Sequence, residues 1–146
     1  MRVSHSVQPA VPDAVEANKR VIRRLFDEVF NQGNLQVVEE LWIPGRLEEG
    51  KQSTIDLRSA FPDYHRTIEA QIAEGDLVAT RWTARGTHRG PFRSRVLGRS
   101  IAPTGRGIQT PGVSVHRVID GRVVEAWVLG NDSVELLAQL GAVTRA

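Results

Sequence analysis

The chain has 146 residues, of which 40% are hydrophobic and 25% charged, values typical of one globular domain with its own core. It contains no cysteine, which excludes disulfides, thiolate nucleophiles and cysteine-bound metals. The formal net charge of +2 is too small to indicate a nucleic-acid partner. We see neither a signal peptide nor an apolar run of the roughly 20 residues that a membrane span needs, so we expect a cytoplasmic protein without a membrane partner.

The N-terminal part predicts a tail followed by helices. Residues 1–13 contain two prolines and show no hydrophobic periodicity, which indicates a flexible tail before a single domain of residues 14–146. Apolar residues then recur at helical spacing in segments separated by glycine and proline. The predicted helices are Ala14–Asn31, Leu35–Trp42 and Arg46–Ala60.

The remainder predicts mainly strands, because apolar and polar residues alternate there. Asp120-Gly121 between two alternating runs is the signature of a tight type I′ hairpin turn. Gly90–Arg106, rich in glycine, proline and arginine, is expected to be a long loop, either a lid or an oligomer contact. Pro111-Gly112 predicts a bulge. The predicted strands are Tyr64–Ile72, Leu77–His88, Ile108–Val118 and Arg122–Leu129.

Helices followed by strands in hairpin succession predict an α+β domain. We expect the N-terminal helices to pack on the apolar face of a strongly curved antiparallel or mixed sheet. Such a cone leaves a central pocket unless large side chains fill it.

Two histidines are candidates for this pocket. His116 shares a strand face with Ser114 and Val118; it is either a hydrogen-bonded core residue or a proton carrier, since its unperturbed pKa is near 6.5. His88 lies at a strand end beside Gly90, where it either lines the pocket or faces solvent.

Aromatic residues and one arginine are candidates for substrate binding. Trp82 and Trp127 either pack in the core or form apolar walls of the pocket. Arg66 stands where alternation predicts an apolar residue, so it either orients an anionic substrate or extends to solvent at the sheet rim. Tyr64, the only tyrosine of the chain, is a further candidate for substrate binding.

The junction after the last strand is the third place where we expect a site. Asn131 and Asp132 stand where a buried strand hands over to a helix with Leu136, Leu137 and Leu140 on one face. Asp132 is either a desolvated acid or the cap of a capping box formed with Glu135. No pair of histidines or carboxylates has ligand-like spacing, so we expect no metal.

Several segments in this order resemble the SnoaL-like polyketide cyclases of the nuclear transport factor 2-like superfamily. The resemblance covers roughly Val15–Val143 and rests on FNQGN, AFPDYHRTIEAQIAEGDLVATRWTARGTHRGPF, APTGR and GVSVHRVIDGRVVEAW followed by LLAQLG. It implies an α+β cone with an apolar pocket that acts as a homodimer or higher homo-oligomer on small molecules, without a cofactor.

The resemblance also implies a general acid/base at the end of the last strand, which corresponds here to Asn131 or Asp132. This chain departs from the family pattern at Ile43-Pro44-Gly45, where relatives have a longer stretch. It also has Ala126 where relatives often have histidine. Both changes remove polar groups from the usual catalytic set.

Three functions follow as hypotheses. The first is a cyclase or isomerase that closes a ring in a polyketide-like molecule by an aldol-type step, with Asp132 as proton carrier and His116 assisting. The second is a non-catalytic binding or assembly module of the same fold. The third is epoxide opening, which needs an acid such as His116 or Asp132.

Overall fold

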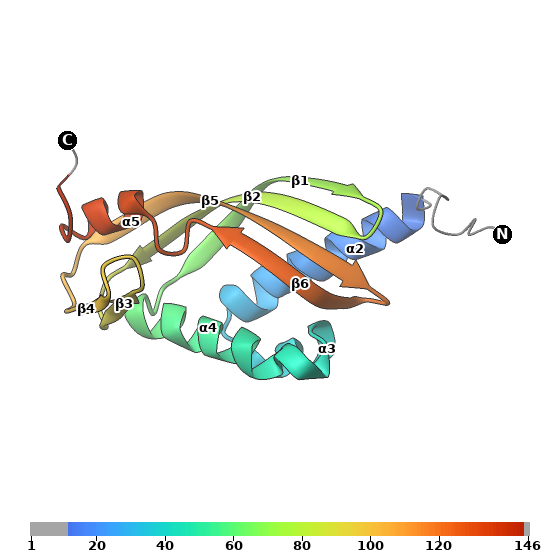
Figure 1. Ribbon diagram of the computed structural model, residues 1–146, viewed down its shortest axis with the longest axis horizontal. Coiled ribbons are helices and arrows are strands. Elements are labelled where there is room, and N and C mark those ends of the chain that lie inside the picture. The colour runs from blue at the N-terminus through green and yellow to red at the C-terminus, as the bar shows by residue number, and fades with distance from the viewer. Residues whose placement is uncertain (1–11, 145–146) are drawn as a thin grey trace.

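The computed structural model describes residues 12–144, which form helices on one side of an antiparallel sheet (Figure 1). The helices are α2 (Pro12–Arg24), the π-helix η1 (Leu25–Phe30), α3 (Leu35–Leu41), the 3-10 turn η2 (Pro44–Arg46), α4 (Leu47–Ala60) and α5 (Val134–Gln139). The strands are β1 (His65–Glu74), β2 (Leu77–Thr87), β3 (Phe92–Ser94), β4 (Arg99–Ile101), β5 (Gly107–Ile119) and β6 (Arg122–Leu129). The expected α+β class and all four long strands are confirmed.

The main sheet has the strand order β1-β2-β5-β6, and every pair is antiparallel. Asp120 and Gly121 have φ values of 51° and 77°, as a type I′ turn requires, and they join β5 to β6. Along β5, side chains that point inward are buried and those that point outward are mostly exposed. The alternation of apolar and polar residues in the sequence therefore corresponds to a sheet with one face covered. The other face of the sheet carries no helix (Figure 1).

The core lies between this covered face and the helices. Asn34 caps α3, because its side-chain oxygen accepts a hydrogen bond from the Gln36 amide. The π-helical turn and α4 contribute residues at helical spacing to the core, and β2 contributes the large ring of Trp82. The most deeply buried apolar residues are Ile22, Leu25, Phe26, Val29, Val38, Phe61, Val78, Trp82, Val123 and Leu137.

Two expectations about the helices need correction. The first helix begins at Pro12, before the expected Ala14, and its second half is a π-helix that widens the backbone before Asn31. The rest of the expected tail, residues 1–11, lies outside the described residues. Ser133, and not Asp132, caps α5 by accepting a hydrogen bond from the Leu136 amide at 3.1 Å. The expected capping box is therefore wrong.

The segment expected as a long loop contains the hairpin β3–β4, which stands apart from the main sheet. The bulge expected at Pro111 is also absent, since β5 keeps an unbroken register with β2 there; register shifts occur instead at Ile68/Ala70 and Arg117/Val118. Because β6 ends opposite Val113, Pro111 lies beyond the reach of β6 on that side, so a missing N–H is tolerated.

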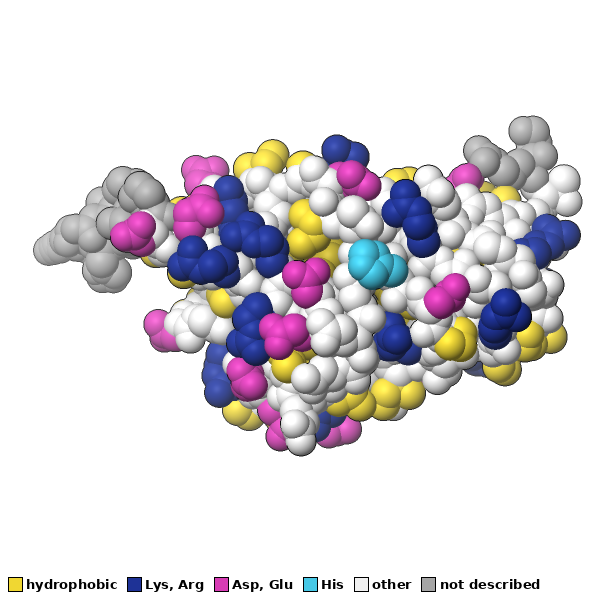
Figure 2. Space-filling model, turned by 180° about the vertical axis from the view of Figure 1, so that it is seen from behind, with side chains coloured by type: hydrophobic (Ala, Val, Ile, Leu, Met, Phe, Trp, Pro, Cys, Tyr) yellow, Lys and Arg dark blue, Asp and Glu magenta, His cyan; other side chains and the backbone are white. Residues whose placement is uncertain are grey.

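Charged side chains of both signs are interspersed on the face seen in Figure 2. Among the described residues, Arg24 pairs with Glu28 at 2.6 Å, and Arg117 pairs with both Asp76 and Glu125 at 2.7 and 2.8 Å. These pairs are partly exposed, so each contributes little to stability.

Candidate functional site

A cavity of about 210 Å³ lies between the inner face of the sheet and the helices η1 and α4. Strands β1, β5 and β6 supply one wall, and α4 with Trp42 supplies the other. The lining residues are Phe30, Trp42, Glu49, Gly50, Ser53, Arg66, His116, Ala126, Val128 and Asn131. An enclosed, mostly apolar space with a few polar groups is what small-molecule sites have in common.

Arg66 reaches this cavity from the beginning of β1, and Asn31 fixes its backbone. The Asn31 side chain accepts a hydrogen bond from the Arg66 amide at 2.7 Å and donates one to the Arg66 carbonyl at 3.0 Å. Asn31 is the C-terminal cap of η1, so the end of the π-helix sets where Arg66 enters the cavity. Only 2% of Arg66 is exposed, which rules out the rim position that we considered from the sequence.

The guanidinium of Arg66 is surrounded by aromatic rings and neutral partners. Its carbon lies 4.0 Å from the ring centre of Phe30 and 4.1 Å from that of Trp82. Nε donates a hydrogen bond to the Tyr64 hydroxyl at 2.8 Å, and Nη2 donates one to Oδ1 of Asn131. Tyr64 and Trp82 therefore support Arg66 from behind and do not themselves line the cavity.

His116 lines the cavity from the centre of β5 and is 2% exposed. Within the described chain, its Nδ1 is buried without a hydrogen-bond partner. Burial, together with the positive charge of Arg66, lowers the pKa of His116 from 6.5 to about 4. His116 is therefore a neutral imidazole at physiological pH.

The structure separates Asn131 from Asp132. Asn131 lines the cavity and accepts the hydrogen bond of Arg66. The Asp132 carboxylate instead accepts hydrogen bonds from the Ser94 hydroxyl at 2.9 Å and the Arg95 and Val96 amides at 2.6 and 3.1 Å. Asp132 thus anchors the β3–β4 hairpin and does not line the cavity.

Two other candidates also lie elsewhere. Trp127 follows Ala126, which lines the cavity, so strand alternation turns Trp127 to the outer face, where it is 48% exposed. It is not a wall of the pocket. His88 is buried against Phe61, with Nδ1 3.0 Å from the Thr104 hydroxyl, and it holds the segment after β2. His88 is neither exposed nor part of the cavity.

A family model for SnoaL-like polyketide cyclases matches residues 20–140, which includes every part of this cavity. The chain belongs to the SnoaL-like polyketide cyclase family. No curated protein matches it significantly. The family assignment accords with the sheet, the helices and the enclosed space between them.

Solved structures similar to this SnoaL-like chain agree with it over most of their length. IdmH of Streptomyces antibioticus, a proposed polyketide cyclase, is 34% identical with a TM-score of 0.69, covering 85% of this chain and 98% of that one. A SnoaL-like protein of Jannaschia sp. CCS1 is 27% identical with a TM-score of 0.75, covering 92% and 96%. AclR of Streptomyces galilaeus, a proposed hydroxylase, is 26% identical with a TM-score of 0.75, covering 90% and 85%.

Residues of α4 complete the cavity of this SnoaL-like domain and were missed by our sequence reasoning. Glu49 and Ser53 lie one helical turn apart beside Gly50, a spacing that was available as a signal. Arg46 holds the Glu49 carboxylate at 2.9 Å and keeps the pKa of Glu49 below its usual range, and the Glu49 side chain is 62% exposed. Glu49 is therefore a rim residue.

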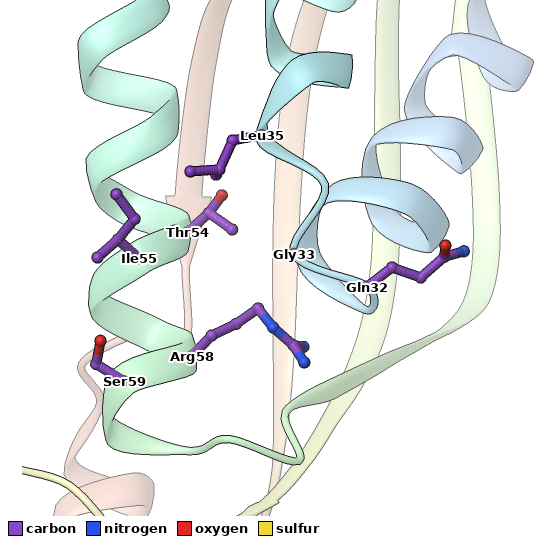
Figure 3. A pocket seen from close by; sticks show the side chains of 7 residues that line it. All are labelled: Gln32, Gly33, Leu35, Thr54, Ile55, Arg58 and Ser59. Atoms are coloured by element: carbon purple, nitrogen blue, oxygen red, sulfur yellow. The ribbon is translucent and has the colours of Figure 1, made fainter.

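A second, open depression lies between α4 and the segment that follows η1 (Figure 3). Arg58 extends from α4 toward Gly33 there. Its guanidinium donates hydrogen bonds to the carbonyls of Phe30, Asn31, Tyr64 and Pro62. Because Arg58 donates to four backbone carbonyls, its role here is to hold the end of η1 and the segment before β1 against α4.

Residues 12–144 contain no group of three His, Asp or Glu side chains placed to hold a metal ion. Nor is any helix of this part of the chain long and apolar enough to cross a membrane.

Proposed function

We propose that this protein is a cofactor-independent cyclase or isomerase that promotes an intramolecular aldol-type ring closure of a polyketide-like molecule. The observation that carries the proposal is the convergence of Arg66, His116 and Asn131 on one apolar cavity. Membership of the SnoaL-like polyketide cyclase family supports the substrate class. Confinement in the cavity favours ring closure because it holds a flexible chain in one folded conformer.

The proposed step uses a proton that leaves and returns. The neutral His116 imidazole takes a proton from a carbon next to a carbonyl, and the resulting enolate carbon attacks a distant carbonyl of the same chain. The alkoxide formed then takes the proton back from His116, so atoms and charge balance. Arg66 and the Asn131 amide stabilise the enolate oxygen, as preorganised donors do in an oxyanion hole.

Charge coupling between Arg66 and His116 fits this sequence of events. The positive charge of Arg66 is one of the two causes that lower the pKa of His116. A substrate oxyanion on Arg66 offsets that charge, so the pKa of His116 rises as the enolate forms. His116 thereby becomes a stronger base as the enolate oxygen gains negative charge.

Asp132 has no part in this step, because its carboxylate is engaged by the β3–β4 hairpin. The test is conversion of a linear diketone whose carbonyls are spaced to close a six-membered ring, followed by carbon NMR as one ketone carbon becomes the alcohol carbon of the aldol product. His116→Phe should lower the rate about 100-fold or more, whereas Asp132→Asn should stay within about threefold of the parent. Loss of turnover in Asp132→Asn, with His116→Phe still active, would mean that Asp132 and not His116 carries the proton.

A non-catalytic binding module is the second candidate. It is favoured by Asn131, an amide at the cavity position where the resemblance implies an acid. Under this alternative the diketone binds, as seen by tryptophan fluorescence, but the parent protein does not convert it.

A further inference from the structure

Arg66 is a buried cation without an anion. Among the described residues, no carboxylate lies within ion-pair distance of it, and its two hydrogen-bond partners, Tyr64 and Asn131, are neutral. The guanidinium has five N–H groups, of which these partners use two. Nη1 has no partner in the described chain, and Arg66 lines the cavity. A buried charge is unfavourable unless something compensates it.

The rest of the cavity does not supply the missing negative charge. His116 is neutral, and Asn131 offers an amide. Glu49 is the acidic residue of the lining, but it lies at the exposed rim and pairs with Arg46. The interior of the cavity therefore carries one unbalanced positive charge.

The geometry around Arg66 is suited to a flat anion. Phe30 and Trp82 lie about 4 Å from its guanidinium carbon and leave the N–H edge as its polar side. A planar guanidinium binds delocalised oxyanions through paired N–H groups. The free Nη1 lies next to Nη2, so the same edge offers two donors to such a group.

Building on the proposed function, we propose that Arg66 is a substrate-binding residue that recognises a planar, delocalised oxyanion, either a free carboxylate or the enolate of a β-dicarbonyl. The substrate oxyanion supplies the negative charge that the described residues do not place beside Arg66. The substrate class is thereby narrowed from apolar polyketide-like molecules to those that carry such an anion at one end.

The test compares an anion with its neutral isostere. Benzoate and benzamide are titrated into the protein while the Arg66 Nε–H and Trp82 indole N–H resonances are followed by NMR. The parent should bind benzoate about tenfold or more tightly, because hydrogen bonds to charged groups are the stronger ones. Arg66→Met should abolish this preference, whereas Arg93→Met, which removes an exposed arginine of β3, should keep it.

Acetylacetone distinguishes the two kinds of anion. If Arg66 accepts an enolate, affinity for acetylacetone rises as the pH passes the ionisation of the diketone, and the rise is absent in Arg66→Met. If it accepts only a carboxylate, benzoate binds and the enolate does not compete.

Stability separates recognition from a purely structural role. Arg66→Met should leave the free energy of unfolding unchanged or raise it, since an uncompensated charge is removed. Equal affinity for benzoate and benzamide in the parent would overturn the proposal, as would a preference that survives Arg66→Met. If the Arg66 proposal fails in this way, conversion of a neutral diketone would still support the proposed function. If the protein prefers the anion through Arg66 but converts no diketone, only the proposed function is overturned.

Discussion

His116 shows at the scale of one residue how burial and a neighbouring charge act together. Burial removes water from the imidazolium, and Arg66 repels it, so the folded protein keeps His116 neutral down to a pKa of about 4. In the unfolded chain the pKa returns to about 6.5. Between these values the unfolded state therefore binds a proton that the folded state does not.

This difference predicts that stability falls as the pH is lowered. The contribution of His116 is fully present above pH 6.5 and is lost progressively toward pH 4, by about 3 kcal/mol in total. Urea unfolding across this range measures it. In His116→Phe the free energy of unfolding should change less steeply with pH, by the equivalent of up to one bound proton, because the other titratable groups remain. An unchanged slope would mean that folding does not lower the pKa of His116.

The hairpin β3–β4 shows at the scale of an element what a single carboxylate contributes. The amides of Arg95 and Val96 lie in its turn and donate to Asp132. The Ser94 hydroxyl donates to Asp132 as well and accepts from the Leu97 amide. One side chain thus ties the hairpin to the junction before α5.

We expect Asp132→Ala to release this hairpin. The Arg95 and Val96 amides should exchange with solvent faster. The free energy of unfolding should fall by about 1 to 3 kcal/mol, since three hydrogen bonds to a charged acceptor are lost and the buried Ser94 hydroxyl loses its acceptor. Hydrogen–deuterium exchange of residues 92–101 provides the measurement. Protection that is equal in the variant and the parent would show that β3 and β4 hold the hairpin without Asp132.

Strand β5 offers a second prediction at this scale. A Cβ on Gly112 would lie 2.1 Å from the Trp82 ring, whereas a Cβ on Gly107 in the same strand meets nothing closer than 3.9 Å. Gly112→Ala should therefore displace Trp82 from Arg66 and cost about 2 kcal/mol or more. Thermal unfolding measures the loss of stability, and the NMR shift of the Trp82 indole N–H measures the displacement of the ring. Gly107→Ala is the matched control and should change neither the unfolding temperature nor the indole shift strongly.

At the scale of the whole molecule, the uncovered face of the sheet carries a row of apolar side chains. Strand register places Ile72, Ala79, Val115 and Trp127 in one row across all four strands. Ile72 is 72% exposed and Leu129, one pair further along β6, is 76% exposed. Contiguous apolar surface of this kind is typical of a protein interface.

We predict that this face joins two copies of the chain. Trp127→Lys places a charge in the row and should shift the protein toward monomer in size-exclusion chromatography with light scattering. Val134→Lys changes another exposed apolar residue, outside the sheet, and should leave the assembly unchanged. A parent protein that is monomeric at all accessible concentrations would contradict the homo-oligomer that the family resemblance implies.

Local patterns were sufficient for the long strands and their order, but not for the π-helix η1 or the hairpin β3–β4. The four long strands and the Asp120-Gly121 turn depend on alternation and on side chains within a few residues, so the sequence alone predicted them. The class of fold followed from the order of these elements. Arg66 was recognisable as a polar residue on an inward face, although its partners were not.

Tertiary structure alone decided which candidates meet. Asn131 and Asp132 are neighbours in the chain, yet one lines the cavity and the other binds the β3–β4 hairpin, because contacts distant in sequence determine which way each side chain turns. Trp127 was misplaced because both faces of β6 carry apolar residues, so its alternation does not say which side is covered. The neutral state of His116 likewise depends on burial in the assembled core and on the charge of Arg66, which lies on a strand far away in the sequence.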